Sequence, residues 1–311
     1  MSVGDLTALD PAARAGIDAA CNFINHKIGR LRRRVATVAV GAAGAVLLVS
    51  AFTSVPLQFA AAGGMIVWVI VAVQARRELA SWYKRMVVQR VVGALGAGLV
   101  YTRESDLTKA RFHDMDLFRE RADIWKSEDQ VAGRRKDIGY ALHEVRAARR
   151  EKRGKHTHEV VFFKGLIVAL EFNKNFAGHT IVVPDREGKI LGGLLGEAET
   201  RRRKQIVRLA NPEFERAYAV YSTDDQEAHY LLTPKLIELV LEARSRLGKL
   251  RLAFYQNSLF VAVPSRHDRF EIGLTSKASP QNVLSDLGEV IALAEQLIEV
   301  LDLETRIWTR V

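Results

Sequence analysis

The feature that most constrains this chain is a stretch of 41 residues, from Val35 to Ala75, without a single Asp, Glu, Lys, Arg or His. A run of this length without charge is rare in soluble folds and is long enough for two short membrane spans. Pro56 lies where the chain must turn, because proline cannot continue a helix. The sequence therefore predicts a transmembrane helical hairpin at 35–75, with spans at 35–52 and 57–73. The alternative is one long buried helix, or two core helices, of a soluble fold.

The basic residues near the two spans predict how the hairpin is oriented. Five precede the first span and four follow the second, whereas the short connecting loop has none. Lys and Arg concentrate on the cytoplasmic side of membrane helices. We therefore expect both termini to lie in the cytoplasm. The flanking basic residues are Lys27, Arg30, Arg32, Arg33, Arg34, Arg76, Arg77, Lys84 and Arg85.

Small residues are frequent in both predicted spans, for example Gly41 and Gly44 in the first and Gly63 and Gly64 in the second. Small faces let two helices approach closely in lipid. We expect the two spans to pack against each other, and oligomer formation stays open as the alternative. A signal peptide is not expected, because the apolar run begins well after the N-terminus and a second span follows at once.

The hairpin divides the chain into four predicted segments. Residues 1–34 are expected to form a cytoplasmic amphipathic helix that starts at Asp10-Pro11, because Asp caps helices and proline suits their first position. Residues 35–75 form the hairpin, residues 76–128 a helical membrane-proximal connector, and residues 129–311 a soluble α+β domain. The apolar seam of the first helix is predicted to consist of Ile17, Cys21, Ile24, Ile28 and Leu31.

Beyond the connector the pattern changes to the alternation of apolar and polar residues that is typical of half-exposed strands. Lys164-Gly165 and Pro184-Asp185 predict turns, and Thr223, Thr233-Pro234 and Ser279-Pro280 predict helix starts. Short strands followed by helices indicate an α+β fold, here an N-terminal transmembrane helical hairpin followed by a cytoplasmic, largely antiparallel β-sheet domain with packed helices. The expected strands are 138–142, 160–163, 166–172, 180–183, 206–209, 214–221, 250–255, 259–263 and 270–274.

The net charge of +10 indicates an anionic partner. In a membrane protein, the anionic headgroups of the cytoplasmic leaflet are the nearest such partner. A charged, solvated strand edge is the competing interpretation of the same residues. Nucleic acid is not expected, because no recognition motif accompanies the basic charge. The candidate lipid-surface residues are Arg134, Arg135, Lys136, Arg149, Arg150, Lys152, Arg153, Arg201, Arg202, Arg203 and Lys204.

No catalytic, cofactor-binding or metal-binding constellation stands out in the sequence. The single cysteine, Cys21, excludes an internal disulfide framework and Cys-based zinc sites. His156 and His158 share a strand face and could bind a metal, but they lie in a basic turn, so a structural or solvent role is favoured. For Asp224 and Asp225, helix capping is favoured over a paired-carboxylate site. Solvated or turn positions are favoured for Glu213, Glu215 and Ser222.

A set of short motifs in the second half of the chain resembles a family of uncharacterised bacterial membrane proteins, the domain of unknown function 3137. The motifs are Glu128-Asp129-Gln-Val-Ala-Gly133, Phe163-Lys-Gly165-Leu, Phe172-Asn-Lys-Asn-Phe176-Ala-Gly178, Pro212-Glu-Phe214-Glu215, Val220-Tyr-Ser222, Glu227-Ala-His-Tyr-Leu-Leu-Thr-Pro234, Phe270-Glu271 and Thr305-Arg-Ile-Trp308. The family has no established activity, so the resemblance implies no functional residue. It implies a multi-pass protein of the bacterial inner membrane. Because family members are often encoded near LemA-type membrane proteins, the resemblance also makes a LemA-type protein a candidate partner.

These observations favour a non-enzymatic, membrane-anchored scaffold or adaptor, whose cytoplasmic α+β domain binds a protein partner at the anionic inner leaflet. The first alternative is a lipid-handling or ligand-sensing module with an apolar pocket. The second alternative is an enzyme that acts on a membrane-associated substrate. No cofactor is expected in the leading interpretation.

Overall fold

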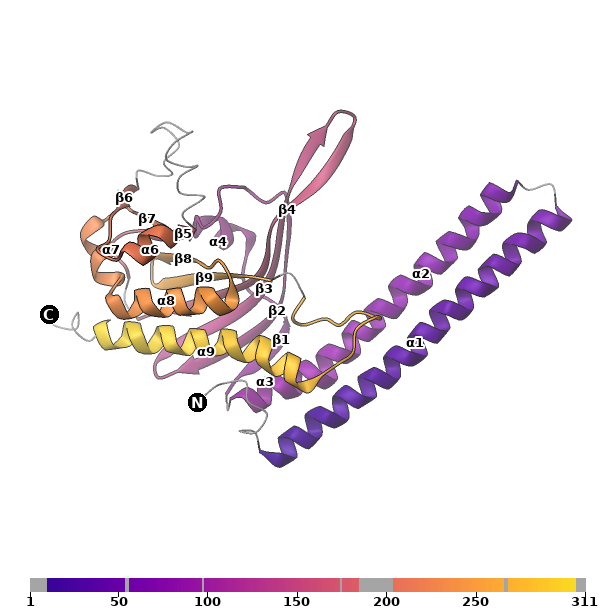
Figure 1. Ribbon diagram of the computed structural model, residues 1–311, viewed down its shortest axis with the longest axis horizontal. Helices are drawn as coiled ribbons and strands as arrows, with labels where there is room; N and C mark the ends of the chain where they lie inside the picture. Colours follow the sequence, from indigo (N-terminus) through magenta and orange to yellow (C-terminus); the bar gives the residue numbers. More distant parts are fainter. Residues whose placement is uncertain are drawn as a thin grey trace. The chain divides into compact units, whose positions relative to one another are not determined.

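The computed structural model describes residues 10–53, 56–96, 98–173, 175–184, 204–265 and 268–305 (Figure 1). The chain folds into two compact units that are each discontinuous in sequence. The described part of the helical unit comprises residues 10–53, 56–96 and 268–286. The described part of the sheet unit comprises residues 98–173, 175–184, 204–265 and 287–305.

The helical unit begins with one long helix, α1 (Pro11–Phe52), of 42 residues. Asp10 caps it by accepting a hydrogen bond from the backbone N–H of Ala13 (3.4 Å), and Pro11 occupies the first helical position, where its missing N–H costs nothing. At 1.5 Å per residue the helix is about 63 Å long, roughly twice the hydrocarbon thickness of a bilayer. The predicted amphipathic helix and the predicted first span are therefore parts of a single helix, with no break at residue 34.

A second rod follows Pro56 and consists of α2 (Leu57–Tyr83), a π-helical turn η2 (Lys84–Val88) and α3 (Gln89–Leu95). The rod starts directly after the proline, as the sequence predicts. The π turn widens the helix by one residue per turn, which is rare and often marks a functional or strained position.

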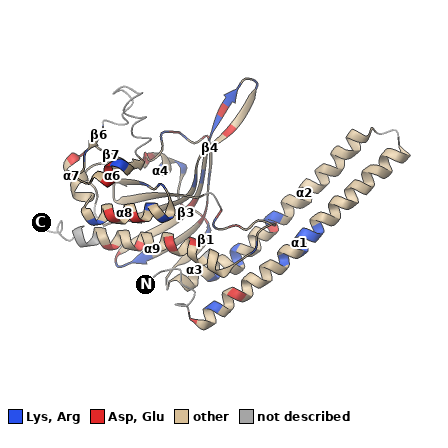
Figure 2. Ribbon diagram, viewed as in Figure 1, with Lys and Arg blue, Asp and Glu red and all other residues tan. Residues whose placement is uncertain are grey.

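Both rods are long and apolar enough to cross a membrane by length and composition, and the most apolar part of each is not buried in the protein. Fourteen of the eighteen large hydrophobic side chains that are exposed among the described residues lie between Val40 and Val73. Figure 2 shows no Lys, Arg, Asp or Glu on these parts of α1 and α2. An apolar surface of this extent is unusual on a soluble protein and suits contact with lipid.

Outside the predicted spans, the same two rods form a stalk, defined here as residues 11–34 of α1 and 75–95 of the second rod. The five predicted seam residues of the first helix are all buried, and Leu79, Tyr83, Val87 and Val91 are buried on the second rod. Lys27 also forms an ion pair with Glu78 across the stalk (2.7 Å). The buried seam follows the 3.6-residue helical period, which is why the sequence reveals it.

A segment from the other end of the chain completes the helical unit. This segment, residues 268–286, is called the strap. Ala278 and Asn25 exchange two hydrogen bonds, and Lys84 of the π turn forms an ion pair with Glu271 (3.3 Å). Phe270 is completely buried. The helical unit therefore consists of the two rods and the strap, and the strap begins more than 170 residues after the second rod ends.

The sheet unit contains one nine-stranded sheet in which every pairing is antiparallel, in the order β1-β2-β3-β4-β9-β8-β5-β7-β6. The predicted α+β class, with a largely antiparallel sheet, is therefore confirmed. The strands are β1 (Val100–Glu104), β2 (Ile124–Arg135), β3 (Ile138–Arg153), β4 (His156–Glu171), β5 (Thr180–Pro184), β6 (Gln205–Val207), β7 (Tyr218–Ser222), β8 (Arg251–Tyr255) and β9 (Ser258–Pro264).

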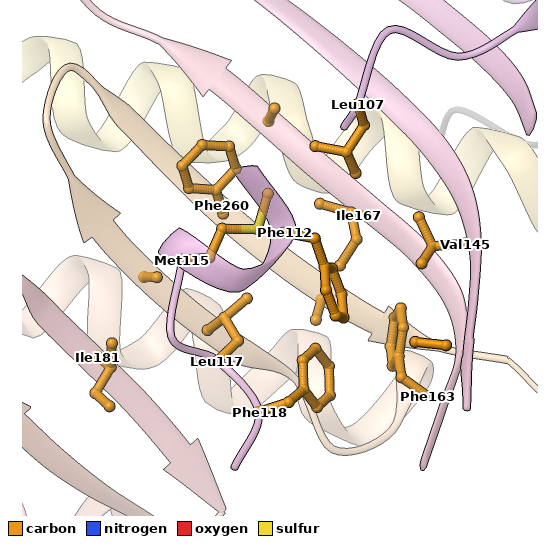
Figure 3. Packing of buried hydrophobic residues seen from close by; sticks show 14 of the residues in the cluster. Leu107, Phe112, Met115, Leu117, Phe118, Val145, Phe163, Ile167, Ile181 and Phe260 are labelled. Atoms are coloured by element: carbon orange, nitrogen blue, oxygen red, sulfur yellow. The ribbon is translucent and has the colours of Figure 1, made fainter. Parts of the chain in front are cut away.

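Helices cover both faces of this sheet. On one face α8 and α9 lie side by side (Figure 1), and Tyr140 of β3 donates a hydrogen bond to Glu295 of α9 (3.1 Å). The short helix α4 lies over the other face (Figure 3). The described helices are α4 (Lys109–Asp114), α6 (Pro212–Ala217), α7 (Asp225–Leu231), α8 (Pro234–Leu247) and α9 (Pro280–Thr305), whose first turns belong to the strap.

The core under α4 is aromatic. Phe112 of α4 stacks on Phe118 with ring centroids 5.2 Å apart and meets Trp125 of β2 at 4.6 Å. Phe118 in turn lies 4.7 Å from Phe163 of β4. Figure 3 shows the rings of Phe112, Phe118 and Phe163 close together beside α4, with Ile167 and Phe260 on the strands of the sheet. Aromatic rings bury large areas, so this cluster fixes the segment around α4 on the sheet.

Two predicted elements differ from the structure because local capping or close packing overrides the hydrophobic pattern. The expected strand 214–221 starts instead as helix α6 and becomes β7 only at Tyr218. Asn211 accepts hydrogen bonds from the N–H groups of Glu213 and Phe214 (3.0 Å each), which starts a helix ahead of the strand. The expected connector, 76–128, is helical only in part, since it also contains β1 and the start of β2.

The expected turn at Lys164-Gly165 is also wrong. β4 runs through both residues, and the hairpin turns at Gly154, where φ is +61°. Gly165 is needed for another reason: a Cβ at this position would lie 2.1 Å from the carbonyl oxygen of Val263 in β9. The expected strand 270–274 is absent, because this segment belongs to the strap and contains no strand among its described residues.

Candidate functional site

The predicted lipid-surface residues do not form one patch on the sheet unit. Arg134, Arg135 and Lys136 lie at the turn before β3, and the group from Arg149 to Arg153 lies at its far end. At about 3.4 Å per strand residue, these two groups are separated by roughly 45 Å. Arg201, Arg202 and Arg203 lie outside the described residues. The predicted basic residues that the structure describes therefore occupy separate parts of the sheet unit.

The far ends of β3 and β4 extend beyond the sheet as a two-stranded ribbon (Figure 1). We call residues 149–160 the basic arm. β2 pairs with β3 only as far as Ala148, and β9 pairs with β4 only from Gly165 onward, so the arm pairs only with itself among the described strands. Its residues from Arg149 to Glu159 are all exposed. An isolated two-stranded ribbon has little stability of its own, which makes its presence outside the sheet notable.

The arm carries an excess of positive charge (Figure 2). Five Lys and Arg side chains stand against two Glu side chains, which gives a net charge of +3. Glu159 pairs with Arg146 at the base of the arm, and Glu151 lies 4.0 Å from Arg149. The other four cations form no ion pair with any described residue. These four are Arg150, Lys152, Arg153 and Lys155.

The turn between β2 and β3 is different, because its charge is already engaged within the unit. Arg135 donates a hydrogen bond to Glu299 of α9 (2.6 Å) and lies 3.9 Å from Glu295. Arg134 donates to the backbone carbonyl of Asp137 (3.3 Å). The turn therefore helps to hold α9 on the sheet, and it offers less free charge than the arm.

Lys204 lies inside the sheet unit and not on its surface. Its side chain is 2% exposed, and its Nζ donates a hydrogen bond to Asp116 Oδ2 at 2.7 Å. Asp116 follows α4 and has a positive φ of +55°, which turns the chain toward Lys204. This ion pair connects positions 88 residues apart in the sequence. Burial makes Lys204 unsuitable as a headgroup ligand.

The sheet unit also contains a polar cluster around the buried His143 that resembles a catalytic site in composition. Ser105 Oγ lies 2.9 Å from His143 Nδ1 and accepts a hydrogen bond from Ser127 (2.7 Å), and Asp106 lies 3.7 Å from the same ring nitrogen. A Ser-His-Asp triad instead needs the serine and the carboxylate on different ring nitrogens. Burial lowers the pKa of His143 to about 4, so the ring is neutral at pH 7. This arrangement is a hydrogen-bonded structural cluster.

Two of the family-like motifs meet in space. Glu227 accepts hydrogen bonds from the N–H groups of Ala177 (2.7 Å) and Gly178 (2.6 Å), and the Thr223 hydroxyl accepts from the N–H of His179 (2.8 Å). Asp224 caps α7 by accepting from the N–H of Glu227 (2.9 Å), as predicted from the sequence. These motifs therefore hold the loop before β5 against α7. No group of three or more His, Cys, Asp or Glu among the described residues could hold a metal ion.

Comparisons with known proteins give one family match and one weak structural likeness. Residues 161–303 match the family described as Protein of unknown function (DUF3137). The family resemblance seen in the motifs is confirmed over this segment. It covers the strands from β4 onward, the loop clamped by Glu227, and most of α9. No curated protein matches the chain.

One solved structure shares a weak likeness with the chain. It is the crystal structure of the mycobacterial trehalose monomycolate transport factor A, TtfA, with 14% sequence identity and a TM-score of 0.39. The likeness covers 65% of this chain and 86% of that chain.

Several residues of these clusters could not be found from the sequence. His143 and Ser105 are 38 residues apart, and neither lies in a motif. Lys204 stands at the end of a run of four basic residues, which favours a surface position, yet it is buried. The basic arm, by contrast, is visible in the sequence as a charge-rich stretch. What the sequence does not reveal is that the arm leaves the sheet.

Proposed function

We propose that this chain is a non-enzymatic scaffold or adaptor, anchored in the bacterial inner membrane by α1 and α2, whose sheet unit binds a protein partner at the cytoplasmic face. One observation carries this proposal. Two long helices expose their apolar side chains from Val40 to Val73 and continue without a break into a stalk with its own buried core. Such a construction anchors a domain at a membrane.

The orientation follows from the charges at the ends of the spans. Basic residues lie at 27–34 and 76–85, and none lies near Pro56. Because Lys and Arg favour the cytoplasmic side, both ends of the hairpin belong there. The sheet unit follows the second rod directly, so it belongs on the same side. A LemA-type membrane protein is the candidate partner that the family resemblance suggests.

The anchor and its orientation are tested with single cysteines in a Cys21→Ser background. Thr53→Cys, in the predicted external loop, should react with a membrane-impermeant maleimide on intact cells. Thr157→Cys, in the arm, should react only after the cells are opened. Labelling of both positions, or of neither, on intact cells is evidence against this topology. Recovery of the chain without detergent would refute the anchor itself.

The scaffold role is tested by affinity capture of the full chain from native membranes in mild detergent. A reproducible partner, absent from a matched capture with an unrelated two-span protein, is the expected result. Absence of any reproducible partner under native expression would count against the adaptor role while leaving the anchor intact.

The alternative is a lipid-handling module, and one observation favours it. An apolar groove of about 490 Å³ lies between α1 and α2, beside Gly41, Ala45, Gly63 and Gly64. Its lining of small and β-branched side chains would accept an acyl chain. Native mass spectrometry of the detergent-purified chain should then reveal a retained lipid. An enzyme on a membrane-associated substrate is a weaker alternative, because the His143 cluster lacks the geometry of a triad.

A further inference from the structure

We propose that the basic arm, residues 149–160, binds the phosphate-bearing headgroups of anionic lipids in the bilayer that holds α1 and α2. This proposal rests on the membrane anchoring proposed above and names the lipid class that the sheet unit would recognise. It also narrows the predicted lipid surface from eleven basic residues to one structural element.

The first argument is the placement of charge on the arm. Residues directly opposite each other in an antiparallel pair share a face of the ribbon, and neighbours along a strand alternate between faces. Arg149 and Arg153 therefore lie on one face, and Arg150 and Lys152 lie on the other. Either face of the ribbon can therefore bring cations to a flat anionic surface. No acidic residue lies between Lys152 and His158 at the tip.

Second, most cations of the arm are not engaged by carboxylates in the described part of the sheet unit. The two acidic residues of the arm pair with Arg146 and Arg149, toward its base. The four remaining cations face solvent and form no ion pair with any described residue. By contrast, Arg135 and Lys204 are bound to carboxylates of the same unit. A ribbon that needed charge only to stay soluble could carry mixed charges, which repel each other less.

The third argument concerns the strength of the interaction. A Lys or Arg near an anionic membrane surface contributes a factor of about five in partition. Four such side chains on one ribbon multiply to a factor of roughly several hundred before screening by salt reduces it. Even a reduced factor is enough for the arm to contact the membrane, because an anchored domain meets headgroups at high local concentration. Proteins that read DNA sequence add side-chain contacts to base edges. Besides Lys, Arg and Glu, the arm offers polar side chains only at His156, Thr157 and His158.

The experiment uses the full chain in lipid nanodiscs made of phosphatidylcholine alone or with phosphatidylglycerol. The Cys21→Ser, Thr157→Cys chain carries a fluorophore near the tip of the arm, and the headgroups carry a quencher. We expect strong quenching only in discs that contain phosphatidylglycerol. The equilibrium constant for contact between the arm and the headgroups should fall by more than about tenfold when four residues are replaced by Gln. These residues are Arg150, Lys152, Arg153 and Lys155. It should also weaken as salt is raised.

A matched control removes four exposed positive charges elsewhere in the sheet unit. The control substitutions are Lys109→Gln, Lys235→Gln, Arg246→Gln and Lys249→Gln. This variant should be quenched like the parent chain. Equal quenching in both lipid compositions, or equal loss in the arm variant and the control, would overturn the proposal. Binding of a short DNA duplex to the arm in phosphatidylcholine discs, with no response to phosphatidylglycerol, would assign the arm to nucleic acid instead.

Failure of the arm and failure of the anchor are distinguishable in this experiment. A chain that enters phosphatidylcholine discs, judged by co-elution on size exclusion, is anchored whatever its arm does. A chain that stays in solution without discs or detergent would refute the anchoring on which the proposal rests. Circular dichroism of the arm variant, compared with the control, shows whether the sheet unit is still folded.

Discussion

Asn25 and Ala278 lie 253 positions apart in the chain and bind each other through two hydrogen bonds. The N–H of Ala278 donates to Asn25 Oδ1 at 2.8 Å, and Asn25 Nδ2 donates to the carbonyl oxygen of Ala278 at 3.0 Å. The side-chain amide thus takes the place of a neighbouring strand and satisfies both backbone groups of one residue. This pair fastens the strap to the stalk.

We expect Asn25→Leu to loosen the strap, because it leaves both backbone groups of Ala278 without these partners. An unmet buried hydrogen-bonding group costs about 1–3 kcal/mol. Hydrogen exchange of residues 271–279 in the full chain should accelerate by at least about tenfold. Asn22→Leu, at an exposed position of the same helix, is the matched control and should leave exchange unchanged. Unchanged protection in Asn25→Leu would show that the strap is held elsewhere.

Replacing Gly165 by Ala should destabilise the sheet unit. The added Cβ would lie 2.1 Å from the carbonyl oxygen of Val263 and 2.9 Å from Cα of Pro264, and these are backbone atoms that cannot swing aside. We expect the free energy of unfolding to fall by at least about 2 kcal/mol. Gly139→Ala in β3 is the control, since a Cβ there has no atom within 4 Å. Thermal unfolding in detergent, followed by circular dichroism, compares the two variants. Equal melting temperatures would contradict the close approach of β4 and β9.

Lys204→Met should lower the free energy of unfolding much more than the removal of an exposed lysine does. The substitution leaves the Asp116 carboxylate, whose side chain is 11% exposed, without its ion-pair partner at 2.7 Å. Breaking a buried ion pair on one side typically costs about 3–5 kcal/mol. Lys109→Met, at an exposed position of α4, should have little effect. The midpoints of urea unfolding provide the comparison, and similar midpoints would place Lys204 at the surface.

The stability of the sheet unit should fall between pH 6.5 and about 4 because of His143. Burial lowers its folded-state pKa to about 4, below the ordinary value of 6.5. The unfolded chain then takes up a proton on this ring at a pH where the folded chain does not. The stability from the neutral ring is fully present above pH 6.5 and is lost toward pH 4, by up to about 3 kcal/mol.

His143→Gln should remove this part of the pH dependence, because glutamine does not titrate. Chemical unfolding of both chains at pH 7.5 and pH 4.5 makes the comparison. The parent chain should lose more stability than the variant over this interval. Equal losses would mean that His143 is protonated equally easily in the folded and unfolded states.

Cys21 should be inert until the stalk unfolds. Burial, together with the nearby Asp18, raises the pKa of its thiol to about 11. At pH 8 only about one thiol in a thousand is then ionised, and the thiolate is the reactive form. Maleimide labelling of the native chain should therefore be slow and should become fast in denaturant. Rapid labelling of the native chain would show that the seam of α1 is open. Thr157→Cys, on the exposed arm, supplies the reactive control.

The parts of the fold that the sequence predicts are those governed by short-range periodicity. The seam from Ile17 to Leu31 and the break at Pro56 both follow from local rules, and both are confirmed. The alternation in β3 and the proline helix starts at Pro234 and Pro280 are equally local. The class of the fold follows from these elements without any knowledge of their partners.

The mistaken elements share a physical cause. Phe214 alternates like a strand residue, but the Asn211 cap and Pro212 start a helix first. Gly165 looks like a turn residue, but it is required where two strands come close. The ion pair of Lys204 with Asp116 and the contacts of His143 depend on partners 88 and 38 residues away, which no local pattern encodes. The sequence predicts the positive charge of the basic arm. It does not predict that the arm leaves the sheet, because this depends on where β2 and β9 stop pairing.

Because the strap is near the C-terminal end, it can bind the stalk only late in synthesis. A ribosome that has completed Asn25 must add 253 residues before Ala278 exists. At about 5–20 residues per second this takes roughly 10–50 s. Once Leu95 has been added, α1 and the second rod are complete, yet the strap that binds the stalk has not been synthesised. The helices therefore wait, paired with each other, while the whole sheet is produced. A nascent chain cut short between residues 95 and 268 would carry an anchor whose stalk lacks the strap.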